Sequence, residues 1–125
     1  MNAKISYDAR APVASVEFTI TQLLPDYDLF EVEADTPRDV DPMLASQGFK
    51  DLLDDARAIL ENDLAGDGLE IAQLTGAICK DAAVHRPGIW LVVRESPSSG
   101  GEMSAPARAR VAAAAEMLQS KLGLS

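Results

Sequence analysis

Two different spacings of apolar residues occur in this short chain, and together they restrict its fold more than any other feature. Residues 13–21 alternate apolar and polar side chains, which predicts a half-buried strand. Residues 49–60 instead repeat their apolar side chains every three or four positions, which predicts an amphipathic helix. A chain of 125 residues with both patterns is expected to form one α+β domain over residues 1–125.

The rest of the N-terminal half extends this pattern. Residues 30–35 alternate apolar and acidic side chains, so we expect a second strand that pairs with the first through a loop around residues 24–28. The pair Asp41-Pro42 is typical of a helix N-terminus. The amphipathic helix should therefore begin there and end at the glycines at positions 66 and 68.

The C-terminal half predicts two more helices and one strand. Asp67 can cap a second helix that ends at Pro87-Gly88, and its apolar side is formed by Ile71, Leu74, Thr75, Ile78, Cys79 and Ala82. The wholly apolar run 89–93 predicts a strand that is central or covered on both faces. Ser104 can cap a final alanine-rich helix. The predicted order is β-β-α-α-β-α, a sheet of about three strands with helices packed mainly on one face.

The cysteine content and the length of the apolar runs predict the cellular location of the chain. Cys79 is the only cysteine, so neither an internal disulfide nor a cysteine-based metal cluster can form, and we expect a reducing cytoplasmic location. The N-terminus lacks the apolar stretch of a signal peptide, and no run approaches the roughly 18 apolar residues that a membrane span needs. We predict no cofactor.

The net charge of −9 lies entirely in the first half of the chain. Residues 1–65 hold fourteen acidic and five basic residues, whereas residues 66–125 hold six of each. The densest part contains a single base, Arg38, and seven acids: Asp26, Asp28, Glu31, Glu33, Asp35, Asp39 and Asp41. We take these seven as candidate partner-binding residues, because a strong negative field favours a basic protein surface.

Other interpretations of this acidic stretch remain open. On a strand, Glu31, Glu33 and Asp35 would point the same way, about 6–7 Å apart. Such a row can hold a hard cation, or it can be an ordinary solvated face that discourages edge-to-edge aggregation. The same acidity argues against nucleic acid and anionic membranes as partners, since both need clustered bases.

Three weaker candidate sites follow from other residue patterns. The loop 95–104, rich in serine and glycine, is expected to be flexible, and with Arg94, Arg108 and Arg110 it could form an anion site at a helix N-terminus. Cys79 and His85 are the only thiol and imidazole, and they could form a nucleophile–base pair only if the chain folded back between them. The simpler interpretation is that the thiol is buried on an apolar face and is chemically inert. Residues 63–74 lack two ligands of a calcium loop, so we predict no metal there.

These observations favour a non-enzymatic protein-binding module, similar in its charge to small acidic inhibitor or immunity-type proteins. The alternative is a small-molecule-binding or regulatory domain with a pocket between sheet and helices. An enzyme without a recognisable motif is the third hypothesis. If helices cover only one face of the sheet, the other face could support a homodimer.

Overall fold

An antiparallel sheet of four strands organises the molecule, in the order β1-β2-β4-β3. The computed structural model describes residues 3–96 and 101–124. The strands are β1 (Lys4–Tyr7), β2 (Val13–Thr19), β3 (Leu69–Asp81) and β4 (Val84–Glu95). The helices are α1 (Asp41–Ala45), α2 (Gln47–Leu64) and α3 (Ala105–Leu122), with short 3-10 turns η1 (Pro25–Tyr27) and η2 (Pro37–Val40). The α+β class is therefore confirmed, with one strand more than expected.

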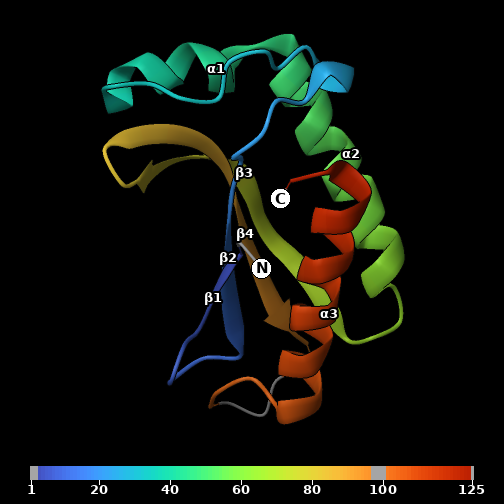
Figure 1. The fold of residues 1–125 in the computed structure, drawn as a ribbon. Coiled ribbons are helices and arrows are strands. Elements are labelled where there is room, and N and C mark those ends of the chain that lie inside the picture. The colour runs from blue at the N-terminus through green and yellow to red at the C-terminus, as the bar shows by residue number, and fades with distance from the viewer. Residues whose placement is uncertain (1–2, 97–100, 125) are drawn as a thin grey trace.

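Helices α2 and α3 lie side by side on one face of the sheet, and α1 crosses its upper end (Figure 1). This agrees with the expectation that the helices pack mainly on one face. The opposite face carries side chains such as Glu17 and Thr19, together with Trp90 and Val92, which are only partly buried. A homodimer through this face remains a prediction.

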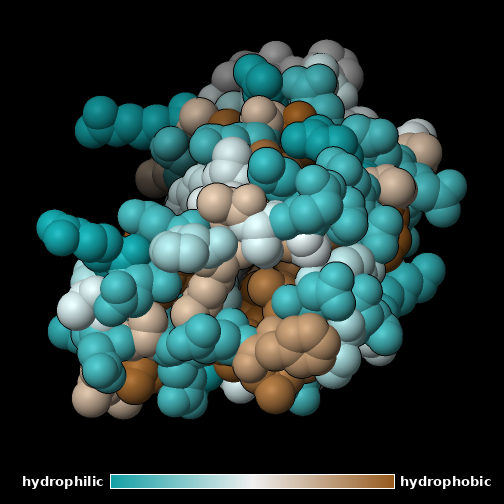
Figure 2. Space-filling model, turned by 90° about the horizontal axis from the view of Figure 1, so that it is seen from above, coloured by the Kyte–Doolittle hydropathy of each residue, from teal (hydrophilic) through white to brown (hydrophobic). Residues whose placement is uncertain are grey.

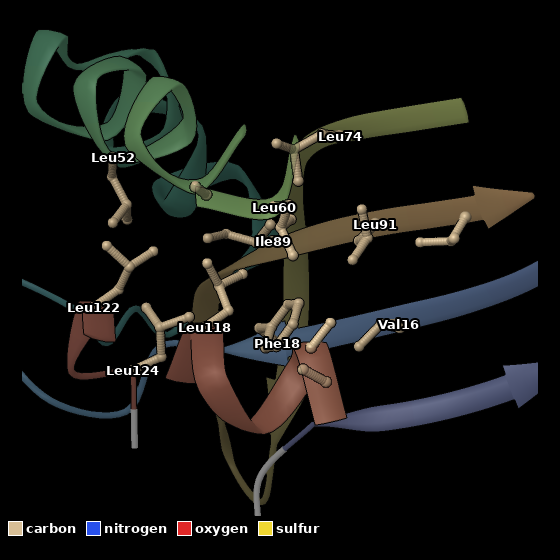
Figure 3. Close-up of a cluster of buried hydrophobic side chains, with 14 of the residues drawn as sticks. Val16, Phe18, Leu52, Leu60, Leu74, Ile89, Leu91, Leu118, Leu122 and Leu124 are labelled. Atoms are coloured by element: carbon tan, nitrogen blue, oxygen red, sulfur yellow. The ribbon is translucent and has the colours of Figure 1, made fainter. Parts of the chain in front are cut away.

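The core fills the layer between the sheet and the two long helices. The β2–β4 register aligns Val16 with Leu91 and Phe18 with Ile89, so their side chains share one face and are almost fully buried. Figure 3 shows these side chains pointing toward leucines of α2 and α3, the two helices that cover this face. Burial of each large side chain of this kind contributes roughly 1.5–3 kcal/mol, so this layer supplies most of the hydrophobic stabilisation of the fold.

The helix starts are set by serine caps. Ser104 Oγ accepts a hydrogen bond from Ala107 N at 3.3 Å, which confirms the predicted cap of α3. Asp41-Pro42 does begin a helix, but α1 ends after five residues. Ser46 is extended there, and its Oγ accepts a bond from Phe49 N at 3.2 Å to start α2. The predicted single helix is thus two helices joined at a cap.

The predicted helix over residues 67–86 is wrong. This segment is β3, a tight turn and the start of β4, and Pro87-Gly88 lies inside β4. The turn contains Ala82, which has a left-handed backbone with φ of 54°. Hairpin turns with positive φ are normally marked by glycine or asparagine, so the sequence carries no visible turn signal between the two strands.

The predicted strand over residues 30–35 is also wrong. Only one bridge forms there, between Ala34 and His85, with N–O distances of 2.8 and 2.7 Å. Strand β2 ends opposite Gly88, and Ala34 pairs with β4 three residues farther along. The run 89–93 lies in β4, which is interior to the sheet as expected, although helices cover only one of its faces (Figure 1).

Candidate functional site

The acidic segment, which we define as residues 26–41, crosses one end of the molecule without a regular strand. Buried apolar side chains hold it and the residues just before it against the core: Leu24, Leu29, Val32 and Val40. Leu24 and Leu29 also exchange backbone hydrogen bonds of 2.9 and 3.0 Å. The segment is therefore fixed at intervals, while the polar residues between these anchors face solvent.

Four of the seven predicted acids line one surface hollow of about 510 Å³. Glu31, Glu33 and Asp35 come from the extended part of the acidic segment, and Asp39 comes from η2. Apolar atoms of α1 and of the β3–β4 hairpin, including Met43 and Val84, complete the lining. No lysine or arginine is among the described lining residues, so this acidic hollow concentrates negative charge beside an apolar wall.

The other three predicted acids lie outside the acidic hollow. Asp26 lines a neighbouring hollow near the end of α3. Asp28 ends η1 with a left-handed backbone, φ 55°, a conformation that aspartate tolerates better than most residues. Asp41 is exposed at the start of α1. The candidate partner-binding set thus divides into four acids that converge and three that do not.

Arg86 fixes one side of the acidic hollow. Its side chain is 12% exposed, and it pairs with Glu33 at 2.8 Å and with Asp81 at 2.9 Å. It also donates a hydrogen bond to the Val32 carbonyl oxygen at 3.3 Å. One arginine thus ties the acidic segment to the β3–β4 hairpin, and it neutralises Glu33 more than the other three acids.

The remaining charges of the acidic hollow are less compensated. Within the described residues, Glu31 and Asp35 form no ion pair within 4 Å, and both are exposed. Asp39 accepts a hydrogen bond from Thr36 Oγ1 at 2.9 Å. No cluster of three or more histidine, cysteine, aspartate or glutamate side chains in the described chain has metal-binding geometry. Glu31 and Asp35 are thus the carboxylates of the acidic hollow that no basic side chain of the described residues compensates.

A second hollow of about 490 Å³ adjoins the acidic hollow and was not predicted from the sequence. Glu31 and Glu33 line both of them. Leu23 and Phe30 line the second one with 52% and 65% of their surfaces exposed, although both are large apolar residues. Figure 2, which views the molecule from above, shows apolar atoms gathered into a patch within a mainly hydrophilic surface. In the sequence, the only indication of this second hollow is that Leu23 and Phe30 are apolar.

A third hollow of about 390 Å³ continues from the second toward the end of α3. The two share Gln22 and Leu23 in their linings. Lys121 and Asp26 both line this far end, so their opposite charges offset each other there. The three hollows are thus adjacent through shared lining residues, and we call the set of three the amphipathic groove, with its negative charge concentrated at the α1 end.

Tyr27 fastens the acidic segment to α2. Its hydroxyl donates a hydrogen bond to Asp55 Oδ2 at 2.6 Å. Burial of the ring, followed by this contact with Asp55, raises the pKa of Tyr27 to about 12. Beneath it, an added Cβ at Gly48 would overlap the Tyr27 carbonyl oxygen. The close approach of η1 to α2 therefore depends on a glycine.

The three predicted anion-site arginines each form ion pairs with acids of this chain, and they share none of these acids. Arg94 pairs with Glu70 at 3.0 Å, and Arg108 pairs with Glu102 at 2.6 Å. Arg110 pairs with Asp63 at 2.7 Å and with Asp67 at 2.8 Å.

The loop between β4 and α3 is closed at its base. Its middle, residues 97–100, lies outside the described residues, so its predicted flexibility stays a prediction. At its ends, Glu95 accepts hydrogen bonds from Ser104 N and Oγ at 2.9 and 2.7 Å. These bonds lower the pKa of Glu95.

Cys79 and His85 lie on neighbouring strands but do not face each other. Cys79 pairs across the hairpin with Arg86, whereas His85 pairs with Lys80. Because successive side chains of a strand alternate between faces, the thiol and the imidazole point to opposite sides of the sheet. Cys79 is buried over Gly88, and burial raises the pKa of its thiol, which disfavours the reactive thiolate.

Comparison with known proteins adds no functional assignment: the chain matches no family model, and no curated protein or solved structure is similar enough to count as a relative. In the described residues, no helix has both the length and the apolar character required to cross a membrane.

Proposed function

We propose that this protein is a non-enzymatic binding module that engages a basic protein partner through its acidic N-terminal half. The observation that carries this proposal is the convergence of Glu31, Glu33, Asp35 and Asp39 on one hollow. Only Glu33 among them has an ion-pair partner within the described chain. A lysine or arginine side chain placed there would satisfy carboxylates that now face water.

The scaffold supports such a role because it presents these acids without having to rearrange. The Leu24–Leu29 bridge, the Ala34–His85 bridge and the Arg86 contacts hold the acidic segment at three points. A partner that binds a preformed surface loses less affinity to ordering than one that must fold a loop. Complementary charge should also accelerate association and make it sensitive to salt.

Charge reversal at the two unpaired acids tests this function. The variant Glu31→Lys/Asp35→Lys leaves Glu33 in place, because Arg86 needs that carboxylate. Its matched control is Asp54→Lys/Glu116→Lys, which makes the same charge change at exposed positions of α2 and α3. Each protein is immobilised at low salt, exposed to lysate of the source organism and eluted with a salt gradient, and the eluted proteins are identified by mass spectrometry.

We expect the wild type and the control to retain the same basic protein, and the Glu31→Lys/Asp35→Lys variant to lose it. Elution should occur at moderate salt, since exposed charges are screened beyond about 10 Å at 0.1 M ionic strength. Equal retention by all three proteins would contradict the proposal, because binding would then be independent of the acidic hollow. Loss of retention by the control as well would mean that total charge, and not this site, governs binding.

A further inference from the structure

Among the residues that the structure describes, three large apolar side chains are exposed, and two of them line the same hollow. Within the described residues, the exposed large apolar side chains are Leu23, Phe30 and Ile78. Leu23 and Phe30 line the middle of the amphipathic groove, whereas Ile78 lies on the edge strand β3. Adjoining exposed apolar side chains with a polar rim are typical of a recognition surface.

The local structure explains why Leu23 and Phe30 remain outside the core. Each is next in sequence to a buried anchor, Leu24 or Leu29, which are 7% and 3% exposed. The backbone bridge between these two anchors holds them inward. Their neighbours Leu23 and Phe30 are therefore held at the surface by the same backbone that seals the core.

The charge around this apolar pair restricts what can cover it. Glu31 follows Phe30 directly, and Glu31 and Glu33 line both the apolar and the acidic hollows. An anionic membrane or a nucleic acid would place its phosphates against these carboxylates, which is unfavourable. A second copy would bring an acidic surface against another, since the chain carries a net charge of −9. A basic segment with apolar side chains complements both hollows at once.

We propose that the partner is recognised through one amphipathic peptide segment, which places an apolar side chain between Leu23 and Phe30 and a lysine or arginine in the acidic hollow. This proposal rests on the proposed function, since it names the chemistry of the partner at the same site. The charges along the amphipathic groove also determine which end of the segment carries its basic side chain. Its basic end lies toward Asp39, and its more neutral end lies toward Lys121.

Short synthetic peptides provide the probes. The first combines leucines and lysines in an amphipathic pattern, the second replaces its leucines by serines at the same charge, and the third replaces its lysines by glutamates. Fluorescence anisotropy at low salt measures the Kd of each for the wild-type protein. We expect the first peptide to bind at least about tenfold more tightly than the second, because buried apolar anchors carry much of the energy of such interfaces. The third should not bind.

Two variants locate the apolar contact. Leu23→Ser/Phe30→Ser should weaken the first peptide about tenfold or more and leave the second unchanged, because only the first has an apolar group to lose. Ile78→Ser removes an exposed apolar side chain of comparable size on β3, and it should change neither Kd. Thermal unfolding of each variant checks that its fold is intact.

The outcomes separate this inference from the proposed function. If both basic peptides bind equally and Glu31→Lys/Asp35→Lys abolishes both, the acidic hollow acts alone and the apolar contact is overturned, while the proposed function stands. If neither basic peptide binds, both proposals fail. If the wild type dimerises in solution and Leu23→Ser/Phe30→Ser is monomeric, a second copy covers the groove and the peptide assignment is overturned.

Discussion

The helix-covered sheet and the acidic segment both contain large apolar residues, but these are buried in the first region and partly exposed in the second. Phe49, on α2, is completely buried against the sheet, whereas Phe30, in the acidic segment, is 65% exposed. In the first region, register and helical spacing direct most of the large apolar side chains inward. In the second, a few anchors are buried and the residues between them face solvent. We therefore expect stability to depend mainly on the first region and the proposed recognition to depend on the second.

The largest expected effect comes from comparing the two phenylalanines directly. Phe49→Ala removes a ring from a fully buried site and should lower the free energy of unfolding by about 3–5 kcal/mol. Phe30→Ala should change it by less than about 0.5 kcal/mol, because that ring is mostly in water already. Urea denaturation of both variants measures the difference. Similar losses in the two variants would show that the acidic segment is part of the cooperative core, and the comparison would fail.

The next effect tests how the two regions are joined. Gly48→Ala would place a Cβ against the Tyr27 carbonyl oxygen, so η1 or α2 must shift. We expect a loss of about 1–3 kcal/mol, as for other overpacked sites. Alanine is otherwise the better helix former, so the sign of the effect is diagnostic. Gln47→Ala, at an exposed position in the same turn, is the control and should be nearly neutral. A stabilising Gly48→Ala would mean that η1 does not pack closely on α2.

The helix caps provide a smaller and more local comparison. Ser46→Ala and Ser104→Ala each remove an N-cap acceptor and should cost about 1 kcal/mol. Only Ser104 also donates to a carboxylate, Glu95. Chemical denaturation at neutral and acidic pH should separate the two variants.

The pH dependence follows from the sign of the Glu95 shift. Its pKa in the folded protein lies below the ordinary value of 4.5, because Ser104 donates to the ionised form. The stability that this contact contributes is therefore present above pH 4.5 and is lost as the pH falls through the folded pKa. The loss caused by Ser104→Ala should shrink in acid, whereas the loss caused by Ser46→Ala should not follow this titration. Parallel pH profiles would contradict the hydrogen bond from Ser104 Oγ to Glu95, which is the part of this contact that the substitution removes.

The success of sequence interpretation also differs between regions. The positions at spacings of three and four from residue 49 to 60 identified the buried side of α2, and Ser104 identified the start of α3. In both cases local pattern and tertiary packing require the same residues. The alternation over residues 13–21 succeeded for the same reason, since β2 buries every second side chain.

The prediction failed at the β3–β4 hairpin because the local sequence signals for strands and for a turn are weak or misleading there. Ala82 occupies a left-handed position without glycine, so the turn was invisible, and the apolar positions of β3 also fit a helical spacing. Pro87-Gly88 suggested a helix end. In the structure, a Cβ at Gly88 would lie 2.5 Å from the Phe18 carbonyl oxygen, so this glycine permits β2 and the buried Cys79 to approach β4. The glycine at position 88 is therefore explained by this tertiary contact and not by a helix end.

The candidate site was predictable in its charge but not in its shape. Glu31, Glu33 and Asp35 do converge, because the chain around them is extended even though it pairs at only one position. The addition of Asp39 depends on η2, and the exposure of Leu23 and Phe30 depends on the inward anchors Leu24 and Leu29. Neither feature has a periodic pattern that sequence alone could expose.

The smallest expected effect concerns the contact between Tyr27 and Asp55, and it appears only in strong alkali. The pKa of Tyr27 is raised from 10.0 to about 12 in the folded protein, by burial first and then by the Asp55 carboxylate. The folded state therefore holds its proton more tightly than the unfolded state. The resulting stability is complete below pH 10 and is lost as the pH rises toward 12.

Ultraviolet absorbance of tyrosinate measures this pKa directly in a Tyr7→Phe background, because the chain has two tyrosines. Tyr27 should titrate near 12, and Asp55→Asn should bring its pKa closer to 10.0, since that change removes the charged acceptor while retaining a polar group. Asp54→Asn, at an adjacent exposed position, should leave the titration unchanged. A Tyr27 that titrates near 10.0 in the parent protein would show that the acidic segment is detached from α2 in solution. The amphipathic groove would then form only when a partner holds the segment in place.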